Sequence, residues 1–222
     1  MKIRIGFLKH LSPSPEIFDL LVHLPEQQLP GSAYLENCRI LVADTGCRLI
    51  TAPFLADNAL CMAYLAPKLE HWQVACYPGG NYQEGRDINI IHTPFGNIAL
   101  CVGADIFQPQ YARLAALRGC RLLICGLWPF SYDVGGSSYL ADSRRLFLAG
   151  PWGAAQANCL PVALAGPSGG QLILPLGMTE DRSGLGRSEY DSDELEAAYR
   201  FFPVFDSFNP GFYATYQKEL LP

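Results

Sequence analysis

The sequence predicts an α/β fold in which two β-sheets pack against each other between outer helices. Apolar runs of strand length recur along the chain and alternate with segments of helical periodicity. Between residues 88 and 125, strands and a helix follow one another in the order typical of a sheet covered by helices. About nine to eleven strands are expected in total, which is too many for one small open sheet. A two-sheet sandwich with outer helices therefore fits better than a doubly wound sheet.

The first part of the chain is predicted to consist mostly of strands. One helix is expected over residues 33–45, where apolar side chains recur at the spacing of one helical face, and Gly46 suits the position just after it. A turn at Ala66-Pro67 would reverse the chain between two strands. The strands of this part are expected at residues 3–8, 20–24, 47–52, 59–65 and 69–76.

The second part combines further strands with two helices. Pro109 is placed to open a helix that Gly119 ends. Asp191, with Glu194 three residues later, predicts a capping box at the start of the helix ELEAAYRFF. The strands here are expected at residues 88–93, 97–102, 120–125, 162–165 and 171–175.

Composition excludes several classes of protein. The chain has 222 residues, which predicts a single domain over residues 1–222. A net charge of -5 with few adjacent basic residues argues against nucleic-acid binding. The apolar runs are too short for a membrane span or a signal peptide, so a cytoplasmic protein with no membrane partner is expected.

Cysteine and histidine patterns predict neither a metal nor a cofactor. The eight cysteines form no C-x-x-C pair and mostly lie in apolar runs, which is typical of reduced core thiols. None of the four histidines has a second histidine at ligand spacing, and no phosphate-binding glycine motif follows a strand. One local pattern does indicate a site. The strand NIALCV runs into Gly103 and then into a helix opened by proline, and a sharp turn of this kind presents its residue to a cleft.

Several motifs, in order, resemble those of the carbon–nitrogen hydrolases (nitrilase superfamily). LLVHLPEQQLPG at 20–31 is similar to the family's strand that ends in Pro-Glu. TPFGNIALCVGADIFQPQ at 93–110 is similar to the signature around the family's nucleophilic cysteine. AAQANCLPVALAGPSGGQLILPLG at 154–177 and the segment from 193 to the aromatic tail match later family segments. The resemblance covers nearly the whole chain.

This resemblance implies a fold, an assembly and a chemistry. The fold is a four-layer αββα sandwich, here shortened at the N-terminal helix because about a dozen residues replace a long helical segment. Family members usually form dimers through the helices that flank the sheets. They act on amides and nitriles with a cysteine nucleophile, a glutamate general base and a lysine that stabilises the developing negative charge.

The resemblance places this chemistry on residues that mostly cannot perform it. Glu26 matches the general base, the lysine position falls near Gln73, and the nucleophile position falls on Gly103. Family residues that support the site are replaced by Ala154, Ala157 and Gln110. The sequence therefore predicts a catalytically silent hydrolase-like protein, a pseudoenzyme that is a homodimer and binds a small amide, nitrile or carboxylate ligand or a partner.

An active amidase-type hydrolase is the alternative hypothesis. Its nucleophile would be Cys101, which lies two residues before Gly103 on the same strand, or Cys125 at the end of the next strand. Lys68 would be its cation, although it follows a predicted turn and is expected at the far end of its strand. The other interpretation of these residues is two core thiols and an exposed turn charge.

Two structural expectations follow from the sequence. If the matches are right, the Cα atoms of Glu26, Gln73 and Gly103 cluster within a span on the order of 10 Å. The tail over residues 201–222 contains seven aromatic residues and few charges, so it is expected to need cover, in its own core or across a homodimer interface.

Overall fold

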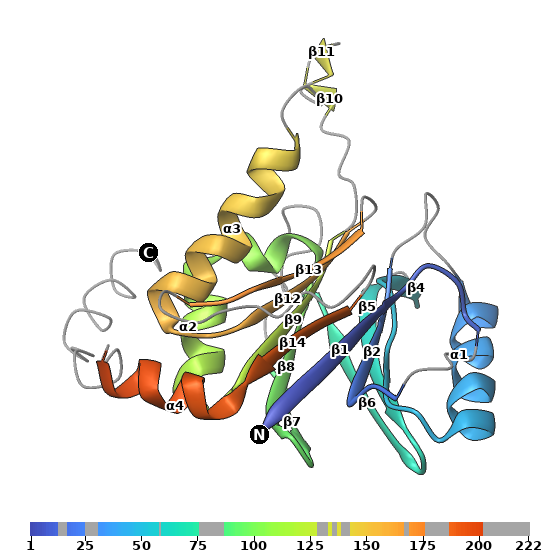
Figure 1. Cartoon of the computed structure of the whole chain (residues 1–222). Coiled ribbons are helices and arrows are strands. Elements are labelled where there is room, and N and C mark those ends of the chain that lie inside the picture. Colours follow the sequence, from blue (N-terminus) through green and yellow to red (C-terminus); the bar gives the residue numbers. More distant parts are fainter. Residues whose placement is uncertain are drawn as a thin grey trace.

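The chain forms a four-layer sandwich of helices, two sheets and helices (Figure 1). The structure is a computed structural model. In Figure 1, α1 covers one outer face and α2 and α3 cover the other, as the sequence and the family resemblance predict. The described residues are 1–12, 17–24, 31–57, 59–75, 87–127, 133–134, 137–138, 143–166, 169–175 and 187–201.

The larger sheet has seven strands in the order β14-β1-β2-β3-β5-β4, and β6 pairs with β5. Parallel pairs join β1 to β2 and β2 to β3, whereas β5 and β6 form an antiparallel hairpin. The strands are β1 (Lys2–Leu8), β2 (Leu20–His23), β3 (Leu49–Ile50), β4 (Phe54–Ala56), β5 (Ala59–Ala66), β6 (Leu69–Val74) and β14 (Arg187–Asp191).

The smaller sheet has five strands in the order β13-β12-β9-β8-β7. Its centre, β8-β9-β12, is parallel, and antiparallel strands close both edges. The strands are β7 (Ile90–Thr93), β8 (Gly96–Val102), β9 (Leu122–Gly126), β12 (Val162–Gly166) and β13 (Gly169–Ile173), and a separate two-stranded pair consists of β10 (Asp133–Val134) and β11 (Ser137–Ser138).

The helices follow local signals in the sequence. They are α1 (Ser32–Thr45), the 3-10 helix η1 (Gly103–Phe107), α2 (Pro109–Leu117), α3 (Ser143–Asn158) and α4 (Ser192–Phe201). α1 ends as expected, since Gly46 has a φ of 69° and donates its N–H to the Val42 carbonyl. α2 begins at Pro109, and the Asp191 carboxylate accepts the Asp193 N–H at the start of α4 (2.9 Å). None of the described helices is long and apolar enough to cross a membrane.

Alternation along β8 divides the core between two layers. Ile98, Leu100 and Val102 pack between the sheets, together with the inward-facing side chains of β1, β2 and β5. Ala99 and Cys101 face the other way and pack under α2 and α3. A third cluster fills the space between α1 and the seven-stranded sheet. Each sheet is therefore apolar on both faces, which is why its strands lack a simple polar alternation.

Four of the elements described here were missed or shortened by the sequence analysis. The strand expected at 47–52 is only Leu49–Ile50, and β4 and β14 were not expected. α3 was missed because Gly150, Pro151 and Gly153 weaken the helical pattern. Gly150 has a packing reason, since a Cβ there would lie 2.8 Å from the Phe107 ring of η1. Between β1 and β2, the described residues 9–12 and 17–19 contain no helix, consistent with the predicted shortening.

Gly170 and Gly153 make a matched pair that tests the inter-sheet packing. A Cβ at Gly170 would meet the Phe7 ring at 2.1 Å, whereas a Cβ at Gly153 in α3 would meet nothing within 4 Å. Gly170→Ala is expected to lower the free energy of unfolding by about 1–3 kcal/mol because Phe7 must move. Gly153→Ala is expected to raise it by up to about 1 kcal/mol. Urea unfolding of both variants measures the difference, and equal effects would contradict the described contact.

Candidate functional site

The carboxyl ends of several strands meet at one end of the sandwich. One cross-strand row of the seven-stranded sheet consists of Val22, Ile50, Tyr64 and His71. Because β2 and β6 run in the same direction, Leu24 and Gln73 each lie two residues beyond this row, toward the same end of the sheet. The end of β2, where Glu26 would follow, and the end of β6 thus belong to the same edge of the molecule.

The five-stranded sheet contributes the ends of β8 and β9 to this place. Gln73 is hydrogen-bonded to Asp87 and Asn89, which lead into β7, and β7 pairs with β8 through Ile90 opposite Ala99. The side chain of Gln73 therefore lies level with the last residues of β8. At the end of β9, Gly126 lies against Met62 and Pro53, because a Cβ on it would be 2.6 Å from the Met62 Sδ. Both sheets thus end together around the candidate site.

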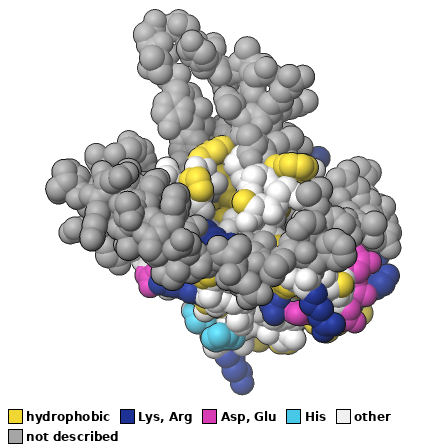
Figure 2. Space-filling model, turned by 90° about the vertical axis from the view of Figure 1, so that its left-hand side faces the viewer, with side chains coloured by type: hydrophobic (Ala, Val, Ile, Leu, Met, Phe, Trp, Pro, Cys, Tyr) yellow, Lys and Arg dark blue, Asp and Glu magenta, His cyan; other side chains and the backbone are white. Residues whose placement is uncertain are grey.

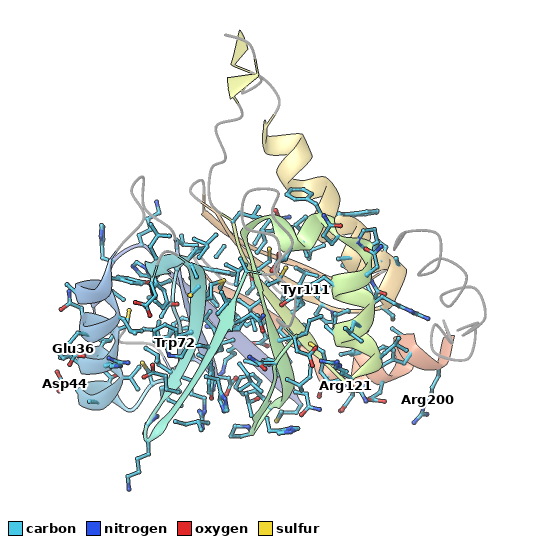
Figure 3. The ribbon with its side chains drawn as sticks, turned by 180° about the vertical axis from the view of Figure 1, so that it is seen from behind. Glu36, Asp44, Trp72, Tyr111, Arg121 and Arg200 are labelled. Atoms are coloured by element: carbon cyan, nitrogen blue, oxygen red, sulfur yellow. The ribbon has the colours of Figure 1, made fainter. Side chains whose placement is uncertain are left out.

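Gly103 occupies the turn that the sequence analysis singled out. It follows β8 directly, is buried, and starts η1 with a φ of 59°. That left-handed conformation suits glycine and strains residues with a Cβ. The turn is held from the helix side by Tyr111 of α2, whose hydroxyl donates to the Leu100 carbonyl. Figure 3 shows Tyr111 among the side chains between α2 and the sheet. The backbone is thus formed for a sharp strand-to-helix turn, but its residue carries no reactive group.

Gln73 is buried, and both ends of its carboxamide are hydrogen-bonded. Its Nε2 donates to the carbonyls of Val74 (3.0 Å) and Asp87 (3.2 Å). Its Oε1 accepts the N–H of Asn89 (3.0 Å). A neutral amide that is held in this way provides no positive charge to a substrate.

Glu26 lies outside the described residues, so its side chain is not placed. Leu24, two residues before it, lies three strand spacings from Gln73 along the sheet, which is roughly 14 Å. Of the three predicted site residues, Gln73 and Gly103 thus lie at strand ends on the same side of the sandwich. The convergence of all three within the predicted span stays a prediction.

The candidate replacement nucleophiles face away from the inter-sheet space. Cys101 and Cys125 lie opposite each other on β8 and β9, and both are fully buried in the core under α2 and α3. Burial raises the pKa of the Cys38 thiol to about 11 and that of the Cys120 thiol to about 12. None of the described cysteines forms a disulfide. This environment is that of core thiols and not of an activated nucleophile.

The remaining candidates supply no charge to the site. Lys68 is exposed in the turn between β5 and β6, with a φ of 65°, at the opposite end of β6 from Gln73. Ala154 is buried in α3, Ala157 is exposed, and Gln110 is half-buried in α2. In the described ranges, no three His, Cys, Asp or Glu side chains gather in a way that could hold a metal ion.

A buried histidine near the end of β2 was not selected by the sequence analysis. His23 is 3% exposed, and its Nδ1 lies 2.9 Å from the hydroxyl of Tyr34 on α1. The same hydroxyl accepts the N–H of Ala52 (2.7 Å). The sequence shows only that His23 comes at the end of an apolar strand. That position does not tell whether its side chain is buried against a partner or exposed to solvent.

Comparison with solved structures shows which known proteins share this fold. No family model matches the sequence, and no curated protein matches it. The structure is similar to a carbon–nitrogen hydrolase from Helicobacter pylori, with a TM-score of 0.70, 17% identity, and coverage of 96% of this chain and 98% of that chain. A CN-hydrolase superfamily protein from Xanthomonas campestris gives a TM-score of 0.67 at 14% identity, covering 94% and 98% of the two chains. Nit3 of Saccharomyces cerevisiae, a nitrilase superfamily member, gives a TM-score of 0.63 at 15% identity. The match covers 91% of this chain and 94% of that chain.

Selective alkylation tests the placement of the thiols. We expect Cys101, Cys125 and Cys120 to stay unmodified when the folded protein is treated with iodoacetamide at pH 8, because they are buried under the helices. Half-buried Cys47 is expected to react faster than these three. All should react in denaturant, and peptide mass spectrometry identifies each site. Rapid stoichiometric labelling of Cys101 in the folded protein would contradict this placement.

Proposed function

We propose that this protein, which has the nitrilase-superfamily fold, is a catalytically silent relative of the carbon–nitrogen hydrolases that binds a small ligand or serves as a partner subunit. The observation that carries the proposal is Gly103. The strand, turn and helix that would present a nucleophile are formed, and the residue at the turn has no side chain.

The chemistry of amide hydrolysis explains why this substitution is decisive. A thiolate must attack the carbon, a base must move the proton, and a cation or N–H donors must stabilise the oxyanion. Glycine provides no nucleophile, and the Gln73 amide is already hydrogen-bonded to three backbone groups. Removing a catalytic nucleophile typically costs many powers of ten in rate.

The described surroundings of the strand ends favour a small uncharged ligand within the amide, nitrile and carboxylate classes. Gly126, Met62, Pro53 and Gln73 meet there and carry no charge, and the nearby η1 contains a buried acidic residue, Asp105. An amide or nitrile loses less hydration than a carboxylate in such surroundings, because burying an unpaired charge is far more costly. Similar solved structures include an amidase from Nesterenkonia, which agrees with this ligand chemistry.

An active amidase is the second candidate. Its support is the Cys101 thiol near the end of β8, which forms no disulfide, and a fold shared with hydrolases. Cys101 points into the helix-covered core, so it would have to leave that core to reach a ligand between the sheets. The lack of disulfides among the described cysteines also supports the proposed cytoplasmic location.

A homodimer is proposed on the side of α2 and α3. Figure 2 looks onto this side and shows hydrophobic side chains on its upper part. Phe107, Leu114, Leu117 and Trp152, on η1, α2 and α3, are each more than a third exposed. Large apolar side chains that gather on one face indicate an interaction surface. Of the aromatic tail that was also expected to contribute, only Phe201 lies within the described residues.

Activity measurements test the silent-site proposal. The wild-type protein is expected to hydrolyse no simple amide at a measurable rate. Gly103→Cys combined with Gln73→Lys should at most yield a thiol that alkylates faster than the native cysteines, because Ala154, Ala157 and Gln110 do not restore the supporting groups. Amide turnover by the wild type that is lost in Cys101→Ser would overturn the proposal and establish the active-hydrolase alternative.

Solution size tests the proposed dimer. Wild-type protein at micromolar concentration is expected to scatter light as a dimer. Replacing Leu117 and Trp152 together by glutamate should shift it to the monomer, because two charges would be buried in the interface. Ile40→Glu on exposed α1 is the matched control and should leave the mass unchanged. A wild-type monomer would remove the dimer from the proposal.

A further inference from the structure

The edge strands of the two sheets are joined on the side of Gln73. β6 pairs only with β5 among the described strands, and β7 pairs only with β8, so each is an edge strand of its sheet. Residues 87–89 lead into β7 and pass beside β6. Contacts made by this segment therefore connect one sheet to the other.

The hydrogen bonds between β6 and this segment run in both directions. Gln73 donates to the Asp87 carbonyl and accepts the Asn89 N–H through the two ends of one carboxamide. In return, the Asn89 side chain donates from Nδ2 to the Trp72 carbonyl (2.8 Å). Backbone groups that an edge strand and a connecting segment would otherwise leave open are thus bonded to each other.

Arg118 holds the same segment from the helix layer. At the end of α2, its Nη1 donates to the Ile88 carbonyl (2.9 Å) and pairs with the Asp87 carboxylate (2.5 Å). The Arg118 guanidinium lowers the pKa of Asp87, which keeps this carboxylate charged at neutral pH. Gln73 and Arg118 therefore bind residues 87–89 from two different layers, the sheet and the helices.

We propose that Gln73 is a positioning residue that ties β6 to segment 87–89 and thereby joins the two sheets beside the candidate site. The inference goes beyond the proposed function, because it concerns the framework of the site and holds with or without a ligand. The neutral carboxamide fits these partners because one end donates to carbonyls and the other end accepts an N–H. A lysine would supply donors and leave the Asn89 N–H without its acceptor, and a carboxylate would face two carbonyl oxygens.

Residue-specific hydrogen exchange tests the tie. In Gln73→Met, the Asn89 amide proton should exchange about tenfold faster or more, because its acceptor is gone. The exchange rates of amides in the centre of β9 should change only as far as the free energy of global unfolding changes. Gln156→Met removes another side-chain amide that donates to a carbonyl, that of Leu174, and should leave Asn89 exchange unchanged.

A second variant tests the same hydrogen bonds through their pH dependence. A carboxyl at position 73 can replace the amide only in part and only when protonated, since one oxygen then donates one bond, where the amide donates two, and the other oxygen accepts. Burial raises its folded pKa, so its contribution is present at low pH and is lost as pH rises through that value. The melting-temperature deficit of Gln73→Glu relative to wild type should therefore shrink from pH 8 to pH 5. A pH-independent deficit, or unchanged Asn89 exchange in Gln73→Met, would overturn the proposal.

Discussion

Packing between the inner faces of the two sheets is the interaction on which the rest of this structure depends. The buried side chains of β1, β2 and β5 meet those of β8, β9 and β12 in one continuous apolar layer. Tight contacts such as Gly170 against Phe7 and Gly126 against Met62 and Pro53 set how closely the sheets approach. Since the strand ends that frame the candidate site belong to both sheets, their relative position follows directly from this packing.

The candidate site combines a preserved framework with changed chemistry. A sharp turn after a buried strand and a helix tied back by Tyr111 are the features that a nucleophile would need. At the same end, Gln73 uses its polar groups on the backbone and not on a ligand. The fold does not depend on reactive groups at the site, because the stability of the sandwich comes from its apolar layers.

Local signals made much of the fold predictable. The apolar face of residues 33–45 predicted a helix, and the structure confirms it. Gly46 and Pro109 set the end of α1 and the start of α2 by their own conformational preferences. α3 contains Pro151 between two nearby glycines, so its helix depends on tertiary contacts that no local pattern reports. The turn at Gly103 was recognisable because it is local. The bonds of Gln73 were not, since its partners Asp87 and Asn89 follow 14 and 16 residues later and meet it only when the sheets pack.

The pairing of β14 with β1 has a consequence for how the chain acquires its structure. Lys2 is aligned with Asp191, so two strands from opposite ends of the described chain are neighbours in one sheet. During synthesis, the first strand emerges long before its antiparallel neighbour exists, and one edge of it stays open until residues 187–191 have been made. Closing so long a loop is entropically costly, and such non-local pairing slows folding. The seven-stranded sheet is therefore completed late, and a ribosome-bound nascent chain would expose an unpaired β1 edge for most of its elongation.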